Sequence, residues 1–196
     1  LGVLALTGFS LVHQAQARGW KNRAPGWLRR YRYHVLLWIV CSLLLVSLFP
    51  KGYRTLMDEI VVLSTSKTIH EEKEALTPMA LEFNQGIKKL DAAHVDKRPF
   101  LFATLVALLH DVRGYAPENS FYANMLLGVG SLGLAWYLGK KWGGSNATGA
   151  VALLALTSLP IFAQHATGGG IDVINVFMIL CLMVACLNYL EAPSHT

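Results

Sequence analysis

Four stretches of the chain are almost entirely apolar, and each is long enough to form a membrane-spanning helix. A bilayer core about 30 Å thick requires roughly 20 helical residues, and a helix satisfies its own backbone hydrogen bonds where lipid cannot. Asp172 is the single Asp, Glu, Lys or Arg within these stretches. We therefore predict an all-α membrane protein with about four transmembrane helices, at residues 33–49, 119–138, 147–165 and 171–190.

The composition supports this class of protein. Of the 196 residues, 54% are hydrophobic and 15% are charged, against about 25% charged in soluble domains. The net charge is +5, but a nucleic-acid partner is not expected, because such a partner requires basic residues on a folded surface and long stretches here carry none. A disulfide scaffold is not expected either, since all three cysteines lie in apolar spans, where they are small hydrophobic residues.

The basic residues also predict an orientation. Cytoplasmic loops of membrane proteins carry an excess of Lys and Arg. Six of them lie between residues 18 and 32, and the second predicted span ends on Lys140 and Lys141. Residues 1–32 are therefore predicted to be a basic cytoplasmic segment, residues 50–118 an extracytoplasmic loop, and residues 191–196 a cytoplasmic tail.

Two helices lying on the membrane are expected within the outer loop. The first covers about residues 79–90, and a solvated helix packed on the spans is an equal alternative there. The second covers about residues 99–112, which are mostly apolar but too few to cross. The apolar start, residues 1–12, fits the end of an upstream span, a cytoplasmic interfacial helix or an added segment. In the helix predicted at about residues 79–90, the apolar residues at helical spacing are Ala80, Phe83, Ile87 and Leu90.

Two glycine patterns occur within or beside the spans. Residues 128–133 match the GxGxxG sequence of dinucleotide-binding folds, but that motif needs a preceding strand, whereas small residues in a span let helices pack closely. We interpret these glycines as packing residues. The three glycines at 168–170 form either a tight link between antiparallel helices or a place where a ligand approaches the backbone.

Acidic residues from distant segments are expected on the same outer side. Asp58 and Glu59 follow the first span closely, and Asp172 begins the fourth. Carboxylates bind a divalent cation or accept a proton from an attacking hydroxyl. Lys97 and Arg98, in the same compartment, are suited to hold a phosphate. Such residues at membrane level indicate a lipid-phosphate substrate.

The order of these features resembles the N-terminal part of GT-C-type membrane glycosyltransferases. The likeness is to the dolichyl- or polyprenyl-phosphate-sugar enzymes, which include protein mannosyltransferases and the aminoarabinose transferase, and it covers about residues 33–190. It begins with an acidic pair, followed by a basic pair at the start of a membrane-surface helix. Next come a span that ends in Gly and two basic residues, a span whose end contains proline, and an Asp at the start of the following helix. These features are Asp58-Glu59, Lys97-Arg98-Pro99-Phe100, Gly139-Lys140-Lys141-Trp142-Gly143, Ser158-Leu159-Pro160 and Asp172.

The resemblance implies transfer of a sugar from a polyprenyl-phosphate carrier to an extracytoplasmic acceptor, with inversion at the anomeric carbon. The family allows a divalent cation without requiring one, and Asp58 and Asp172 would hold it. The chain departs from the family in having fewer spans, so a fragment or a reduced family member is expected. The implied catalytic residues are Asp58 as general base, with Glu59 and Asp172, and the implied donor-phosphate ligands are Lys97, Arg98 and His165.

A non-catalytic subunit of the same fold is the alternative function. Such a subunit would pack against other membrane subunits in a larger complex, with its site filled by side chains or covered by a partner. The enzyme, in contrast, requires Asp58 and Asp172 to lie close together beside a groove open to membrane lipid. A transporter fits less well, because the span interiors hold almost no charge.

Overall fold

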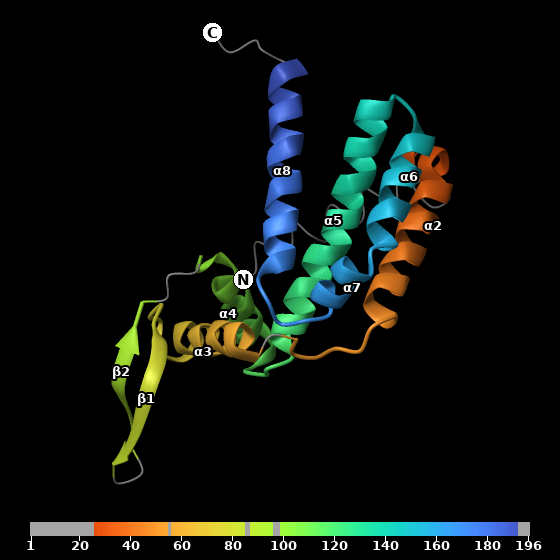
Figure 1. Cartoon of the computed structure of the whole chain (residues 1–196). Coiled ribbons are helices and arrows are strands. Elements are labelled where there is room, and N and C mark those ends of the chain that lie inside the picture. Colours follow the sequence, from red (N-terminus) through yellow and green to blue (C-terminus); the bar gives the residue numbers. More distant parts are fainter. Residues whose placement is uncertain (1–25, 55, 85–86, 96–98, 192–196) are drawn as a thin grey trace, which may run out of the picture. The chain divides into compact units, whose positions relative to one another are not determined.

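The computed structural model describes residues 26–54, 56–84, 87–95 and 99–191. These residues are mostly helical and include a two-stranded antiparallel sheet (Figure 1). The chain divides into two compact units, residues 1–36 and 37–196. The described part of the first unit is the beginning of helix α2 (Gly26–Ser47), where Arg32 Nη2 donates a hydrogen bond to the Tyr33 hydroxyl at 2.8 Å. The rest of α2 and all other described elements belong to the second unit.

Among the described residues, two helices are long and apolar enough to cross a membrane, α5 (Asn119–Gly143) and α8 (Asp172–Glu191). A third crossing would be formed by α6 (Asn146–Thr157) and α7 (Pro160–Ala166) together. The apolar part of α2, Tyr31–Ser47, has 17 residues, fewer than the roughly 20 that a bilayer core requires. Two or three helices could therefore span a membrane, while a fourth span and the orientation of the chain stay predictions.

The predicted third span, residues 147–165, is not one straight helix. Its two parts, α6 and α7, are bent by 72° relative to each other. Leu159 between them has an extended backbone (φ −80°, ψ 108°), and Pro160 opens α7. Proline disfavours a helical backbone in the residue before it but suits the first turn of a new helix. This proline therefore separates the two helices.

The segment predicted as an amphipathic helix over residues 79–90 is instead a β-hairpin. Strands β1 (Thr77–Asn84) and β2 (Ile87–His94) pair antiparallel, with Leu81 opposite Leu90. The helical prediction was wrong because the large apolar residues of β1 also alternate with small or polar ones, which is the period of a strand. The segment also contains Asn84 and Gly86, and both Asn and Gly are poor helix formers.

Helices α3 (Leu56–Glu72) and α4 (Leu101–Arg113) pack against each other. The helix predicted at about residues 99–112 is confirmed by α4, whereas its location at a membrane surface stays a prediction. The buried face of α4 belongs to a hydrophobic cluster that also includes residues of α3, α5 and α8. Its buried members are Val62, Phe102, Val106, Ala123 and Ile174.

The larger hydrophobic cluster joins the second half of α2 to α5, α6, α7 and α8. Trp38 on α2 contributes at its edge and donates a hydrogen bond from Nε1 to the Val129 carbonyl of α5 at 3.1 Å. The three cysteines are all free thiols, as expected. The buried members of this cluster are Cys41, Leu45, Leu132, Leu153, Phe162, Ala163, Ala166 and Val173.

Helix α5 lies in the middle of the second unit, in contact with α4, α6, α7 and α8 (Figure 1). Its close approach to α6 requires glycine, because a Cβ on Gly139 would lie 2.5 Å from the Ala152 Cβ. A Cβ on Gly130 would likewise lie 2.8 Å from the Phe177 ring of α8. Within residues 128–133, Gly128 and Gly130 are therefore packing residues, as the sequence predicted, whereas a Cβ on Gly133 would meet only an ordinary contact at 3.5 Å.

Candidate functional site

Glu59 is a buried carboxylate that links two loops far apart in the sequence. It lies in the first turn of α3 and is 3% exposed. Its Oε1 accepts a hydrogen bond from the backbone N–H of Gly169 at 2.9 Å, and its Oε2 accepts one from the backbone N–H of Arg54 at 2.5 Å. The loop after α2 and the loop between α7 and α8 are thereby held together by one side chain.

The glycine loop at residues 168–170 is closely packed. Asn124, fully buried on α5, donates from Nδ2 to the carbonyl of Gly168 at 2.9 Å and to that of Gly170 at 2.7 Å. A Cβ on Gly169 would lie 3.1 Å from the Tyr53 ring. Of the two interpretations of these glycines, the structure supports a tight link, with the absence of side chains serving close packing.

Asp172 lies beside Glu59 across this loop. The ideal Cβ position of Gly170 is 3.6 Å from Asp172 Oδ2 and 3.8 Å from Glu59 Oε1. The Asp172 Oδ2 also lies 2.9 Å from His165 Nδ1, an ion pair when the imidazole is protonated. The structure thus brings together three of the predicted site residues, Glu59, His165 and Asp172.

Asp58 differs from Glu59 in its surroundings. It is exposed in the first turn of α3, whereas the neighbouring Glu59 is buried. Both oxygens of Glu59 accept backbone N–H groups, whereas the carboxylate of Asp58 lies at the surface. The acidic pair that the sequence presents as one unit therefore consists of one exposed residue and one buried residue that holds the loops.

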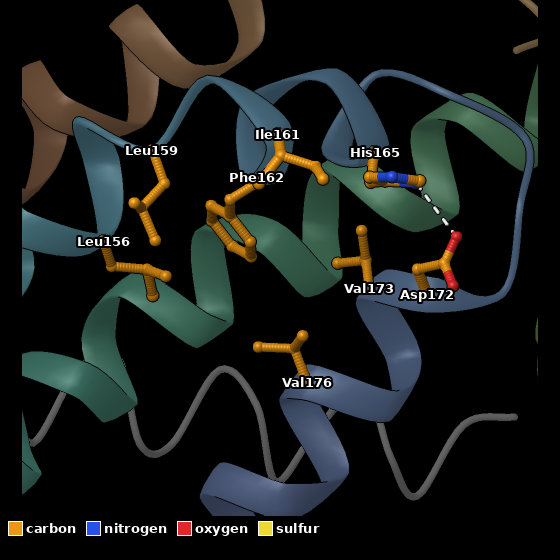
Figure 2. A pocket seen from close by; sticks show the side chains of 8 residues that line it. All are labelled: Leu156, Leu159, Ile161, Phe162, His165, Asp172, Val173 and Val176. Carbon is orange, nitrogen blue, oxygen red and sulfur yellow. Dashed lines mark ion pairs between the residues drawn. The ribbon is translucent and has the colours of Figure 1, made fainter.

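A cavity of about 320 Å³ lies between the end of α6, α7 and the start of α8 (Figure 2). Figure 2 shows His165 and Asp172 facing each other at one side of it, with apolar side chains around the remainder. A space of this kind suits an apolar chain whose polar end lies near the His165–Asp172 pair. The other lining residues are Leu156, Leu159, Ile161, Phe162, Val173 and Val176.

Two predicted ligands of the donor phosphate, Lys97 and Arg98, lie outside the residues that the structure describes. Within the described ranges, no three His, Cys, Asp or Glu side chains come together as metal ligands do. A divalent cation held by Asp58 and Asp172 therefore stays a prediction.

Sequence reasoning missed Arg54, which lies next to the glycine loop. Its Nη2 donates to the Pro50 carbonyl at 2.5 Å and to the Thr167 hydroxyl at 3.4 Å. The available signal was its position in the short loop between the first span and Asp58. Asn124 was missed as well, although an amide within an apolar helix usually has a polar partner.

A second polar cluster joins α3, α4 and the start of α5. His110 is completely buried, with the Asn119 amide nitrogen 2.8 Å from Nδ1 and the Ser66 hydroxyl 3.3 Å from Nε2. A hydroxyl, an imidazole and an amide in this order occur in some nucleophilic enzymes. Here all three side chains are at most 1% exposed, so no substrate reaches them, and the arrangement links helices.

Charged residues lie at the protein surface next to this buried cluster. His70 Nδ1 lies 2.6 Å from Asp111 Oδ1, and Lys73 Nζ donates to the same oxygen at 3.2 Å. The hydrogen bond with His70 has the largest effect on the pKa of Asp111 and that with Lys73 the next largest, and both hold this pKa below its ordinary value. Burial, and next the neighbouring His70, lower the pKa of His110.

Comparison with known proteins gives no further guide to the site. No protein-family model, no curated protein and no solved structure matches this chain.

Proposed function

We propose that this chain belongs to a GT-C-type membrane glycosyltransferase that transfers a sugar from a polyprenyl-phosphate carrier to an acceptor outside the cytoplasm. The observation that supports the proposal is the approach of the Glu59 and Asp172 carboxylates to Gly170. They come from segments more than 100 residues apart. The apolar cavity next to His165 and Asp172 adds room for a lipid chain at the same place.

In this proposal Asp58 is the general base. Its carboxylate takes the proton of the acceptor hydroxyl, and the hydroxyl oxygen attacks the anomeric carbon from the face opposite the phosphate. The bond between the anomeric carbon and the phosphate oxygen breaks, and polyprenyl phosphate leaves with the electron pair. The configuration at the anomeric carbon is thereby inverted.

The other site residues position the reactants. Glu59 fixes the start of α3, and with it Asp58, against the glycine loop. Asp172 orients the imidazole of His165, which donates a hydrogen bond to the donor phosphate. Lys97 and Arg98 supply further positive charge for the same phosphate.

Replacing Asp58 tests this proposal. Asp58→Asn should lower sugar transfer by about 10²- to 10⁴-fold, the usual contribution of a general base, with no change in membrane insertion. The assay uses membranes containing the complete protein and radiolabelled polyprenyl-phosphate mannose and polyprenyl-phosphate aminoarabinose as donors.

Glu74→Gln is the matched control, because Glu74 is another exposed acid of the same outer segment. This control should transfer sugar at the wild-type rate. Transfer by Asp58→Asn at the wild-type rate would reject Asp58 as the base.

A non-catalytic membrane subunit is the second candidate. The observation that favours it is the apolar exposed face of α8, where Met178, Ile179 and Leu182 are 48–63% exposed and could contact another membrane chain. A subunit predicts that wild-type membranes transfer sugar from neither donor, and that the chain co-purifies with other membrane proteins in a complex of fixed composition.

A further inference from the structure

Two cations lie against one tyrosine ring on the second unit. The Lys51 ammonium lies 4.8 Å from the centroid of the Tyr122 ring, and the Arg113 guanidinium carbon lies 4.3 Å from it. The three residues come from different elements, namely the loop after α2, the end of α4 and the first turn of α5. Three separate segments thus place two positive charges within 5 Å of one point.

Within the part of the chain that the structure describes, neither of these cations is paired with an acid. Among the described residues, no Asp or Glu oxygen lies within 4 Å of the charged nitrogens of Lys51 or Arg113. Lys67 provides a contrast, because it lies 4.9 Å from the Tyr115 ring and is also 3.8 Å from Glu71 Oε1. The attraction of an exposed cation to a ring is weak, and two like charges repel, so an anion bound between Lys51 and Arg113 is favoured.

The place of this cluster indicates the kind of anion. Helix α5 is long and apolar enough to cross a membrane, and Tyr122 lies in its first turn. Tyrosines at the ends of spans lie at the level of the lipid headgroups. Lys51 and Arg113 are both exposed and therefore accessible to a group at that level.

We propose that Lys51, Arg113 and Tyr122 form a binding site for a phosphate group, presented at this level by the headgroup of an anionic phospholipid. The guanidinium of Arg113 matches two phosphate oxygens, and the ammonium of Lys51 adds a second charge. Both cations lie against the Tyr122 ring. This site is separate from the proposed sugar-transfer site, because it uses none of the residues assigned there.

Binding of short-chain phosphatidylglycerol to the purified complete protein in neutral detergent tests the proposal. Lys51→Gln and Arg113→Gln should each weaken binding about fivefold, the effect of one basic residue near an anionic lipid surface, and the double variant should lose more. Lys67→Gln, the matched control, should bind as the wild type does. Isothermal titration calorimetry measures the affinity, and size-exclusion chromatography verifies that each variant is folded.

A competition experiment with inorganic phosphate distinguishes the two sources of the phosphate group. If inorganic phosphate fails to displace phosphatidylglycerol, the site is one for a lipid headgroup. If it displaces the lipid, and its own binding is weakened by the same two substitutions, the site accepts a free phosphate. The proposal is overturned if neither compound binds the wild type, or if Lys51→Gln and Arg113→Gln bind phosphatidylglycerol as tightly as Lys67→Gln does.

Discussion

At the residue scale, the carboxylate of Glu59 holds the site together. Its two oxygens accept the backbone N–H groups of Gly169 and Arg54, and the side chain is 3% exposed. Buried backbone N–H groups that lose their acceptor cost more free energy than the hydrogen bond itself contributes. This residue is therefore a structural link, and the chemistry that we propose belongs to its exposed neighbour Asp58.

Glu59→Gln should lower the free energy of unfolding by about 1–3 kcal/mol, because the amide nitrogen of Gln cannot accept a hydrogen bond and leaves one buried N–H unpaired. Glu74→Gln, an exposed change in the same segment, should stay within about 0.5 kcal/mol of the wild type. Equilibrium unfolding by denaturant in detergent micelles measures both. Equal stability of the two variants would show that the Glu59 hydrogen bonds do not hold the loops.

At the element scale, helices α5 and α6 depend on a glycine contact. A Cβ on Gly139 would lie 2.5 Å from the Ala152 Cβ and 2.8 Å from the Thr148 carbonyl oxygen, whereas one on Gly133 would lie 3.5 Å from its nearest neighbour. Backbone and Cβ atoms cannot turn aside as a flexible side chain does. The two helices can therefore approach this closely only because Gly139 of α5 has no side chain.

Gly139→Ala should reduce the free energy of unfolding by about 1–3 kcal/mol through overpacking. Gly133→Ala is the control on the same helix, and it should be neutral or stabilising because alanine has the better helix propensity. Thermal unfolding of the two purified variants distinguishes them. If both are as stable as the wild type, the close contact of α5 and α6 is absent.

The helix pair α3 and α4 should respond to pH through His110. Burial lowers the pKa of His110 in the folded protein, so the unfolded chain takes up a proton at a higher pH than the folded protein does. Stability should therefore fall as the pH decreases through about 6.5, the ordinary histidine value, and should stop falling below the lowered pKa of the folded state.

This effect can be measured by recording the unfolding temperature at a series of pH values from about 8 to about 5, the range in which histidine titrates. His110→Gln should be less stable overall, but its loss of stability on acidification should be smaller than that of the wild type. An identical loss in both proteins would show that another group causes the pH dependence. Asp111, whose pKa is also lowered, acts only in a more acidic range, below about 4.

At the scale of the whole molecule, the sequence predicted the helices better than their breaks. Hydrophobicity located α2, α5 and α8 because burial in lipid or in a core requires long apolar runs. The same signal does not distinguish one long helix from two, so the bend at Pro160 was missed. In the outer loop, the apolar positions of residues 79–90 fit two periods, and the pairing of β1 with β2, which decides between them, is a tertiary property.

The site was predicted in part. Charge distribution placed Glu59 and Asp172 in one compartment, and the structure brings them together at Gly170. The division of roles between Asp58 and Glu59 was not predictable, because it depends on which side of α3 faces the glycine loop. The contribution of Asn124 was not predictable either, because its hydrogen-bond partners are backbone carbonyls 44 and 46 residues away in the sequence.

The proposed sugar transfer requires that the start of α3 and the start of α8 lie on the same side of the membrane. Single cysteines at positions 58 and 172, both exposed, can be introduced into a variant in which Cys41, Cys181 and Cys186 are replaced by alanine. In intact cells, a membrane-impermeant maleimide should label both, and should not label a cysteine at the exposed position of Trp142 until the membrane is opened. Labelling of position 58 from one side and of position 172 from the other would contradict the account.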